Sequence, residues 1–195
     1  MRVIGVAGWS GAGKTTLLTR LIPLLIKRGM RISTLKHAHR GFDIDRPGKD
    51  SYEHRAAGAS EVLVSSARHY ALLHNLGPGE KEPALPELLR LLAPVDLVLV
   101  EGFKEFAHPK IEVHRSANGK PLLYGNAPNI RAIATDAAEL AVEIPVVDLN
   151  DAQGIAELAL ANAEPIETVL ADLEARPRPQ RIAPRPQGKG ARAAS

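Results

Sequence analysis

Apolar residues group along this chain into short runs that alternate with segments of helical periodicity. The strongest runs are 3–7 and 95–100. Apolar runs of this length are typical of strands buried on both faces of a parallel sheet, and 3–7 is predicted to be a central strand. Weaker strands are predicted at 31–36, 61–65, 70–74, 111–115, 130–134 and 146–148, with 111–115 at a sheet edge.

Between these runs, leucine and isoleucine recur at helical spacing. The pattern is clearest over 14–28, where Gly29 is placed to end the helix and Pro23 predicts a bend within it. Further helices are predicted to start at Asp50, near 84, near 152 and near 166, and Glu53 gives the first of these a sequence like that of a capping box. Alternating strands and helices predict an α/β fold, with a mostly parallel sheet and helices on both faces.

The length of 195 residues favours one folded domain, which we place at 1–175. Residues 176–195 contain repeated proline and arginine without apolar periodicity, so this basic tail is predicted to be disordered. The tail has six basic residues and no acidic ones, whereas the whole chain has a net charge of +3. The predicted domain is therefore mildly acidic, which argues against nucleic acid as its partner.

The chain has no cysteine, which excludes disulfides, thiolate zinc sites and cysteine nucleophiles. The apolar run at 3–7 is too short for the hydrophobic region of a signal peptide, and nothing in the composition suggests a membrane anchor. We therefore predict a cytoplasmic protein without membrane association.

Residues 8–15 read Gly-Trp-Ser-Gly-Ala-Gly-Lys-Thr and match the phosphate-binding P-loop pattern at each fixed position. Glycines allow the backbone amides to point at phosphate oxygens, and the following helix adds its positive end. Lys14 is expected to reach the β- and γ-phosphates, and the Thr15 hydroxyl to bind Mg²⁺. The alternative is a glycine-rich turn that only caps a helix. The predicted nucleotide-binding residues are Gly8, Ser10, Gly11, Ala12, Gly13, Lys14, Thr15 and Thr16.

A P-loop protein that acts on a nucleotide also needs an acid near Mg²⁺. Glu101 follows the run 95–100 and is the first candidate, with a solvated strand end as the alternative reading. Asp43 and Asp45 lie in the long loop after 31–36, where either could approach the metal, and Asp45 is preferred. The alternative for both is a solvated loop carboxylate. The predicted metal ligands are Thr15, Glu101 and Asp45, and the predicted catalytic residues are Lys14, Glu101 and Asp45. His37 and His39 are a weak alternative pair for zinc, because no third ligand stands at suitable spacing.

Several of these segments together resemble one family. They are the P-loop with Thr16, Leu-Lys-His-Ala-His at 35–39, Phe-Asp-Ile-Asp at 42–45, Pro-Gly-Lys-Asp-Ser at 47–51, Arg-Ala-Ala-Gly-Ala at 55–59, Val-Glu-Gly-Phe-Lys at 100–104 and Pro-Lys-Ile-Glu-Val at 109–113. Over roughly 1–160, the chain is similar to the MobB family of molybdopterin-guanine dinucleotide biosynthesis adaptor proteins.

The resemblance implies a GTP-binding homodimer with weak GTPase activity. It also implies a role in assisting the nucleotidyltransferase MobA, which joins GMP to molybdopterin, and GTP with Mg²⁺ as the bound group. The usual guanine-reading motif, Asn/Thr-Lys-x-Asp, is absent from the chain. Thr135 and Asp136 could read guanine or cap a following helix, and both readings stay open.

Two other functions compete with this interpretation. A small-molecule kinase could use the same P-loop, although the loop before Asp50 shows no clear lid helix. A nucleic-acid-binding module could use the basic tail, but the predicted domain is acidic and poor in aromatic residues for stacking.

Overall fold

The computed structural model describes residues 1–38 and 42–176. Contacts divide the described chain into two compact units, which we call the sheet unit (1–35 and the described residues from 94 onward) and the hairpin unit (36–93). The single domain proposed for 1–175 stays a prediction. The predicted disordered tail lies outside the described residues except for Arg176. No helix within the described ranges is long and apolar enough to cross a membrane.

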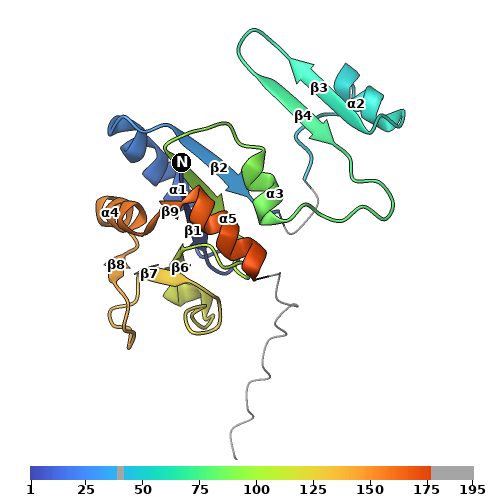
Figure 1. The fold of residues 1–195 in the computed structure, drawn as a ribbon. Helices are drawn as coiled ribbons and strands as arrows, with labels where there is room; N and C mark the ends of the chain where they lie inside the picture. The colour runs from blue at the N-terminus through green and yellow to red at the C-terminus, as the bar shows by residue number, and fades with distance from the viewer. Residues whose placement is uncertain (39–41, 177–195) are drawn as a thin grey trace, which may run out of the picture. The chain divides into compact units, whose positions relative to one another are not determined.

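A mostly parallel sheet forms the centre of the sheet unit (Figure 1). Strand β1 pairs in parallel with β5 on one side and β6 on the other, and β6, β7 and β8 continue the parallel order. In spatial order the strands are β2 (Ile32–Lys36), β5 (Leu97–Glu101), β1 (Arg2–Ala7), β6 (Lys110–His114), β7 (Ile130–Thr135) and β8 (Val146–Asp148). A two-residue strand, β9 (Glu164–Pro165), pairs antiparallel with the start of β1.

The order in which strands are added to the sheet reverses at β1. After β1 the chain adds β2 and β5 on one side, and later adds β6, β7 and β8 on the other. In open α/β sheets, ligands bind beyond the carboxyl ends of the strands at such a switch point. The segment that directly follows β1 is the P-loop.

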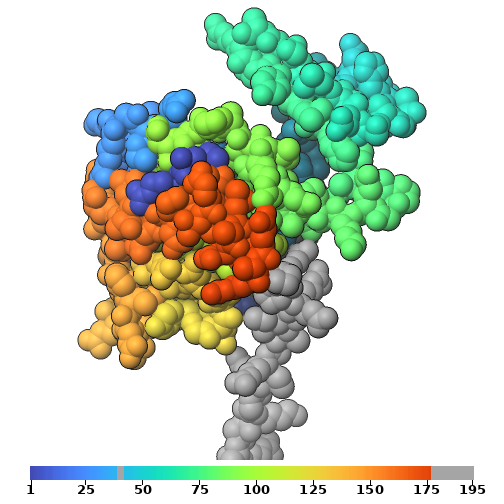
Figure 2. All heavy atoms as spheres, in the orientation of Figure 1, coloured from blue at the N-terminus to red at the C-terminus, as the bar shows by residue number. Residues whose placement is uncertain are grey.

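Helices cover both faces of the sheet. Helices α1 (Lys14–Lys27) and α4 (Ala152–Asn162) pack their leucine, isoleucine and alanine side chains against Ile4 and Val6 of β1 on one face. Helix α5 (Ile166–Ala175) starts directly after β9 and contacts β1, and Ile166 N donates to Met1 O at 3.0 Å. Figure 2 shows the atoms of α5, in red, directly against the N-terminal residues, in dark blue. The predicted α/β fold, with a mostly parallel sheet and helices on both faces, is confirmed.

The hairpin unit contains a separate antiparallel pair of strands, β3 (Glu61–Ser65) and β4 (Tyr70–His74). Helix α2 (Asp50–Ala56) contacts β3, and α3 (Leu85–Arg90) follows later in the chain. Both strands have the bounds predicted from the sequence. The helix predicted from Asp50 is present, but its N-cap is Lys49 and no side chain caps it.

One prediction about the sheet is wrong, and one of the two open readings of Thr135 and Asp136 is excluded. The segment 111–115 is not an edge strand, because β6 pairs with β1 and β7 at once and its first four residues are buried. The helix that Thr135 and Asp136 could have capped does not form, since the chain runs from Asp136 to β8 without one. A short 3-10 turn, η1 (Ser116–Asn118), follows β6 and has no counterpart in the prediction.

Candidate functional site

The P-loop connects the end of β1 to the first turn of α1. Gly11 and Gly13 have φ angles of 80° and 98°, a region that favours glycine because it has no β-carbon. Helix α1 begins at Lys14, and no side chain caps its N-terminus. The first amides of a helix have no partner within the helix and attract an anion. This loop therefore presents backbone donors that fit phosphate oxygens.

Lys14 folds back over the loop that precedes it. Its Nζ donates to Gly8 O and to Trp9 O, both at 2.9 Å. These two hydrogen bonds fix the ammonium beside the loop instead of leaving it on a freely rotating side chain. A positive charge held there complements a phosphate group in the loop.

Thr15 and Glu101 meet beside the P-loop, as the sequence predicted for residues that share a metal. Thr15 lies in the first turn of α1, and its Oγ1 donates to Glu101 Oε1 at 2.9 Å, at the carboxyl end of β5. A hydroxyl and a carboxylate oxygen are the ligand types that Mg²⁺ prefers, so this pair fits the metal. Glu101 is therefore not an isolated strand end.

The turn after Glu101 has an unusual backbone. Gly102 has φ 97° and Phe103 has φ 48°, so two successive residues adopt the left-handed region. For a residue other than glycine this conformation costs about 1–2 kcal/mol. Phe103 is buried and packs edge-to-face on Phe106, with ring centroids 5.3 Å apart, and this packing offsets the strain. The tight turn holds Glu101 at the end of its strand.

The remaining predicted P-loop residues have mainly backbone roles. Ser10 lies at the loop tip, and its carbonyl accepts from Asn118 Nδ2 at 3.2 Å. Ala12 is buried, and its amide donates to Trp9 O at 3.2 Å. Thr16 stands in the first turn of α1, where its carbonyl accepts from Thr19 Oγ1 at 2.9 Å. Their assignment to nucleotide binding stays a prediction that rests on this loop geometry.

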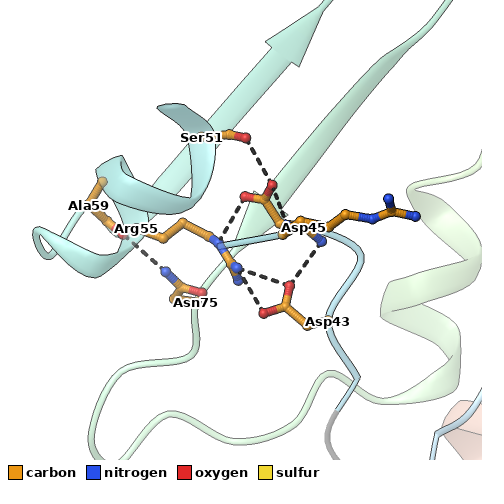
Figure 3. Close-up of polar contacts among 7 residues, drawn as sticks. Asp43, Asp45, Ser51, Arg55, Ala59 and Asn75 are labelled. Atoms are coloured by element: carbon orange, nitrogen blue, oxygen red, sulfur yellow. Dashed lines mark hydrogen bonds and ion pairs between the residues drawn. The ribbon is translucent and has the colours of Figure 1, made fainter. Parts of the chain in front are cut away.

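Asp45 belongs to the hairpin unit, where it forms a compact charge cluster (Figure 3). Its Oδ1 accepts from Ser51 Oγ at 3.0 Å and from Arg46 N at 2.9 Å, and its Oδ2 lies 3.5 Å from Arg55 Nε. Its side chain is 9% exposed. These contacts hold the carboxylate within its own unit, and its assignment to Mg²⁺ and catalysis stays a prediction.

Asp43 joins the same cluster. Its Oδ1 accepts the Asp45 amide at 3.0 Å, and both of its oxygens accept from Arg55 Nη2, at 2.9 and 3.0 Å. The Asp45 amide and then the Arg55 guanidinium hold the pKa of Asp43 below its usual value. Sequence reasoning missed Arg55 as the residue that organises both carboxylates. Its position on the first helix after the acidic loop, in a segment that resembles the MobB family, is the signal that could have suggested it.

A zinc site at His37 and His39 gains no support. His37 Nε2 lies 2.7 Å from Glu82 Oε1 within the hairpin unit, and His39 lies outside the described residues. Across the described parts of the chain, no group of three or more histidine, aspartate or glutamate side chains could hold a metal ion.

Asp136 is tied to the turn that follows β6. Its Oδ1 accepts from Ser116 N at 2.7 Å, and its Oδ2 lies 3.4 Å from Arg115 Nη1. The Ser116 amide is the main cause that lowers the pKa of Asp136. Thr135 Oγ1 accepts from Ala137 N at 3.1 Å and closes a local turn. An open pocket of about 320 Å³ lies at this edge of the sheet, lined by Thr135, Asp136, Ala137, Ala138, Val146, Val147 and Asp148.

The chain matches known proteins over most of its length. Residues 3–136 match the family model described as "Molybdopterin guanine dinucleotide synthesis protein B", MobB. The molybdopterin-guanine dinucleotide biosynthesis adapter proteins of Escherichia coli and Haemophilus influenzae are 40% and 38% identical to it, over 81% and 80% of this chain and 91% and 85% of theirs.

A solved structure has the same fold. The crystal structure of Bacillus subtilis MobB matches with a TM-score of 0.68 at 24% identity, over 84% of this chain and 99% of that one. The family model and the 40% identical relative agree with the P-loop and with Glu101, the acid that faces Thr15. This chain belongs to the MobB family.

Proposed function

We propose that this protein is a GTP-binding accessory factor in the synthesis of molybdopterin guanine dinucleotide. It hydrolyses GTP slowly and assists a MobA-like nucleotidyltransferase that joins GMP to molybdopterin. The observation that carries the proposal is the P-loop, where Lys14 is held over the loop and Thr15 meets Glu101 at 2.9 Å. GTP is chosen over ATP because the relatives are named for a guanine dinucleotide. The cytoplasm stays the predicted compartment.

Thr15 and Glu101 are the residues of the sheet unit that would hold Mg²⁺. When bound, the metal neutralises charge on the phosphate oxygens. The side chains have separate tasks: the P-loop amides and Lys14 bind phosphate, and the Glu101 carboxylate orients the Thr15 hydroxyl. Asp45 remains a third proposed metal ligand, on the basis of its position in the sequence alone.

Replacing Glu101 with glutamine is expected to slow GTP hydrolysis about tenfold or more and to change GTP affinity less. Glutamine keeps the size of the side chain and can still contact Thr15, but it removes the negative charge that a divalent cation needs. Release of phosphate from GTP and the dissociation constant for GTP should be measured on the same preparations. An unchanged turnover rate would show that the role assigned to Glu101 is wrong.

The accessory role can be tested by reconstitution. A MobA-like nucleotidyltransferase, GTP and molybdopterin should be incubated with the wild-type protein, with the Lys14→Ala variant, or without either. We expect the wild-type protein to increase formation of the guanine dinucleotide, and the variant to fail to do so. Equal stimulation by both proteins would show that the accessory role does not depend on Lys14 of the P-loop.

We also propose that the protein is a homodimer through the hairpin unit. In the antiparallel pair β3–β4, Leu63 lies directly opposite Leu72 and both are exposed, by 63% and 56%, with Tyr70 on the same face and 77% exposed. Two strands alone make a marginal sheet, and an exposed apolar face on them needs a cover. A second copy of the hairpin offers the same apolar face in return, as a two-fold interface requires.

The dimer is expected to dissociate when Leu72 is replaced with lysine. A charge in the middle of the apolar face must be desolvated if the interface forms. Leu91→Lys is the control, since Leu91 is an exposed leucine of the hairpin unit, 79% exposed against 56% for Leu72, and lies outside the β3–β4 face. Sedimentation equilibrium should give the mass of two chains for the wild type and the control, and of one chain for Leu72→Lys. A wild type with the mass of one chain would refute the dimer.

A further inference from the structure

The turn that follows β6 lies directly against the P-loop. Asn118 Nδ2 donates to Ser10 O at 3.2 Å, at the loop tip. A β-carbon placed on Gly11 would lie 3.5 Å from Asn118 Oδ1, and one placed on Gly13 would lie 3.4 Å from Arg115 Nη2. The Arg115 guanidinium therefore stands over the part of the loop that directly precedes Lys14.

Asp136 fixes the position of this guanidinium from the neighbouring strand end. Its Oδ2 lies 3.4 Å from Arg115 Nη1, and its Oδ1 accepts the amide of Ser116, the next residue in the chain. One carboxylate thus holds both the side chain and the backbone of the turn. Nη1 faces Asp136, while Nη2 faces Gly13.

Arg115 keeps access to solvent, because its side chain is 40% exposed. An exposed arginine–aspartate pair contributes little to stability, so stability alone gives little reason to hold the guanidinium here. A guanidinium can donate two parallel hydrogen bonds to phosphate oxygens, whereas the Lys14 ammonium acts as a point charge. The two cations approach the loop from different segments, because Arg115 directly follows β6 and Lys14 is the first residue of α1.

We propose that Arg115 is a second phosphate-binding cation of the P-loop, with Asp136 and Asn118 as its positioning residues. Its ligand is a phosphate oxygen of the nucleotide that occupies the loop, so the inference rests on the proposed nucleotide binding. In this assignment Asp136 acts on the phosphate end of the ligand through Arg115 and does not read the base.

The only tryptophan of the chain provides the measurement. Trp9 stands inside the P-loop, with Lys104 Nζ 4.2 Å from its ring centroid and Pro121 O accepting from its Nε1 at 2.7 Å. Its fluorescence should therefore respond when an anion enters the loop. GTP, GDP and inorganic pyrophosphate can be titrated without labels against the wild type and against Arg115→Ala, Arg115→Lys and Asp136→Asn.

We expect Arg115→Ala to weaken GTP, GDP and pyrophosphate binding by about tenfold, Arg115→Lys to recover part of the loss, and Asp136→Asn to show a smaller loss in the same three ligands. Arg131→Ala is the matched control: Arg131 pairs with Glu164 at 3.0 Å and is 47% exposed, at the opposite end of β7 from Asp136. The Arg131→Ala variant should bind GTP, GDP and pyrophosphate with the affinities of the wild type. Thermal unfolding should show the two alanine variants equally stable.

The outcomes separate the two claims. A wild type that binds none of the three ligands refutes the proposed function itself. A wild type that binds them, together with an Arg115→Ala variant whose affinities are within twofold, overturns only the role of Arg115. A loss confined to GTP and GDP, with pyrophosphate binding intact, also overturns it, because the turn would then act on the nucleoside.

Discussion

The Lys110→Met variant is expected to show a smaller rise in unfolding free energy between about pH 6.5 and 9.5 than the wild type. The difference between the two rises is about 3 kcal/mol. Lys110 is fully buried on β6, and its Nζ donates to Phe106 O at 2.5 Å and to His108 O at 2.7 Å. Burial lowers the pKa of Lys110 from 10.5 to about 7. Methionine keeps the long unbranched stem but cannot be protonated.

The direction follows from proton binding. Between about pH 7 and 10.5 the unfolded lysine keeps a proton that the folded lysine has lost, so unfolding becomes less favourable as the pH rises. The cost of burying the charge is therefore fully present below pH 7 and disappears toward pH 10.5. Nearby, burial and then the Lys110 charge lower the pKa of His108, which adds a loss of stability in acid.

Denaturant unfolding at several pH values checks this prediction. The informative quantity is the difference in unfolding free energy between the wild type and Lys110→Met, because titration of all other groups largely cancels. Lys27→Met is the control, since Lys27 is an exposed lysine on α1. A difference that stays constant from pH 6.5 to 9.5 would show that Lys110 does not titrate in this range.

Replacing Gly8 with alanine is expected to lower the unfolding free energy by about 3 kcal/mol and to abolish nucleotide binding. A β-carbon on Gly8 would overlap the backbone carbonyl oxygen of Val113 on β6. Backbone atoms of a central strand cannot move aside as a flexible side chain can. The P-loop would have to shift away from β6, and its amides and the Lys14 contact to Gly8 O would shift with it.

Gly29→Ala separates this overlap from backbone strain. Gly29 also has a positive φ, 82°, but no atom lies within 4 Å of the position of an added β-carbon. Its replacement should cost about 1 kcal/mol through conformation alone. Thermal or denaturant unfolding of both variants gives the comparison, and equal losses at the two glycines would mean that the approach of Val113 is unimportant.

The parts of the molecule that the sequence predicts well depend on local patterns. The P-loop, the apolar strand before it and the helix after it are contiguous, and the acid opposite Thr15 ends the second strong apolar run. The strands β3 and β4 also follow from short apolar segments between turn residues. In each case the pattern that predicts the element is local, although the contact between Thr15 and Glu101 joins two separate elements.

The misinterpretation of β6 has a different cause. Lys110, Glu112 and His114 alternate with apolar residues, a pattern that indicates one solvated face. In the structure Lys110 and Glu112 are fully buried, because backbone groups outside the strand satisfy them. Lys110 Nζ donates to Phe106 O and His108 O, and Glu112 accepts from Leu123 N at 2.6 Å and Tyr124 N at 2.8 Å. Burial raises the pKa of Glu112, and the two amides oppose this effect. No periodicity encodes such partners.

The organisation around the site is likewise long-range. Asp136 holds Arg115 and Ser116 from about twenty residues away, and Asn118 reaches Ser10 across more than a hundred. Arg55 holds Asp43 and Asp45 from ten to twelve residues away without regular spacing. Sequence analysis identified the acidic residues and left open what faces them.

Calorimetric titration of GTP and of ATP, each with Mg²⁺, into the wild type and into Lys14→Ala tests the central claim most directly. We predict that the wild type binds GTP more tightly than ATP, and that Lys14→Ala loses about a hundredfold in GTP affinity, because it removes the ammonium held at 2.9 Å from Gly8 O and Trp9 O. Unchanged affinity in the variant, or tighter binding of ATP than of GTP by the wild type, would contradict it.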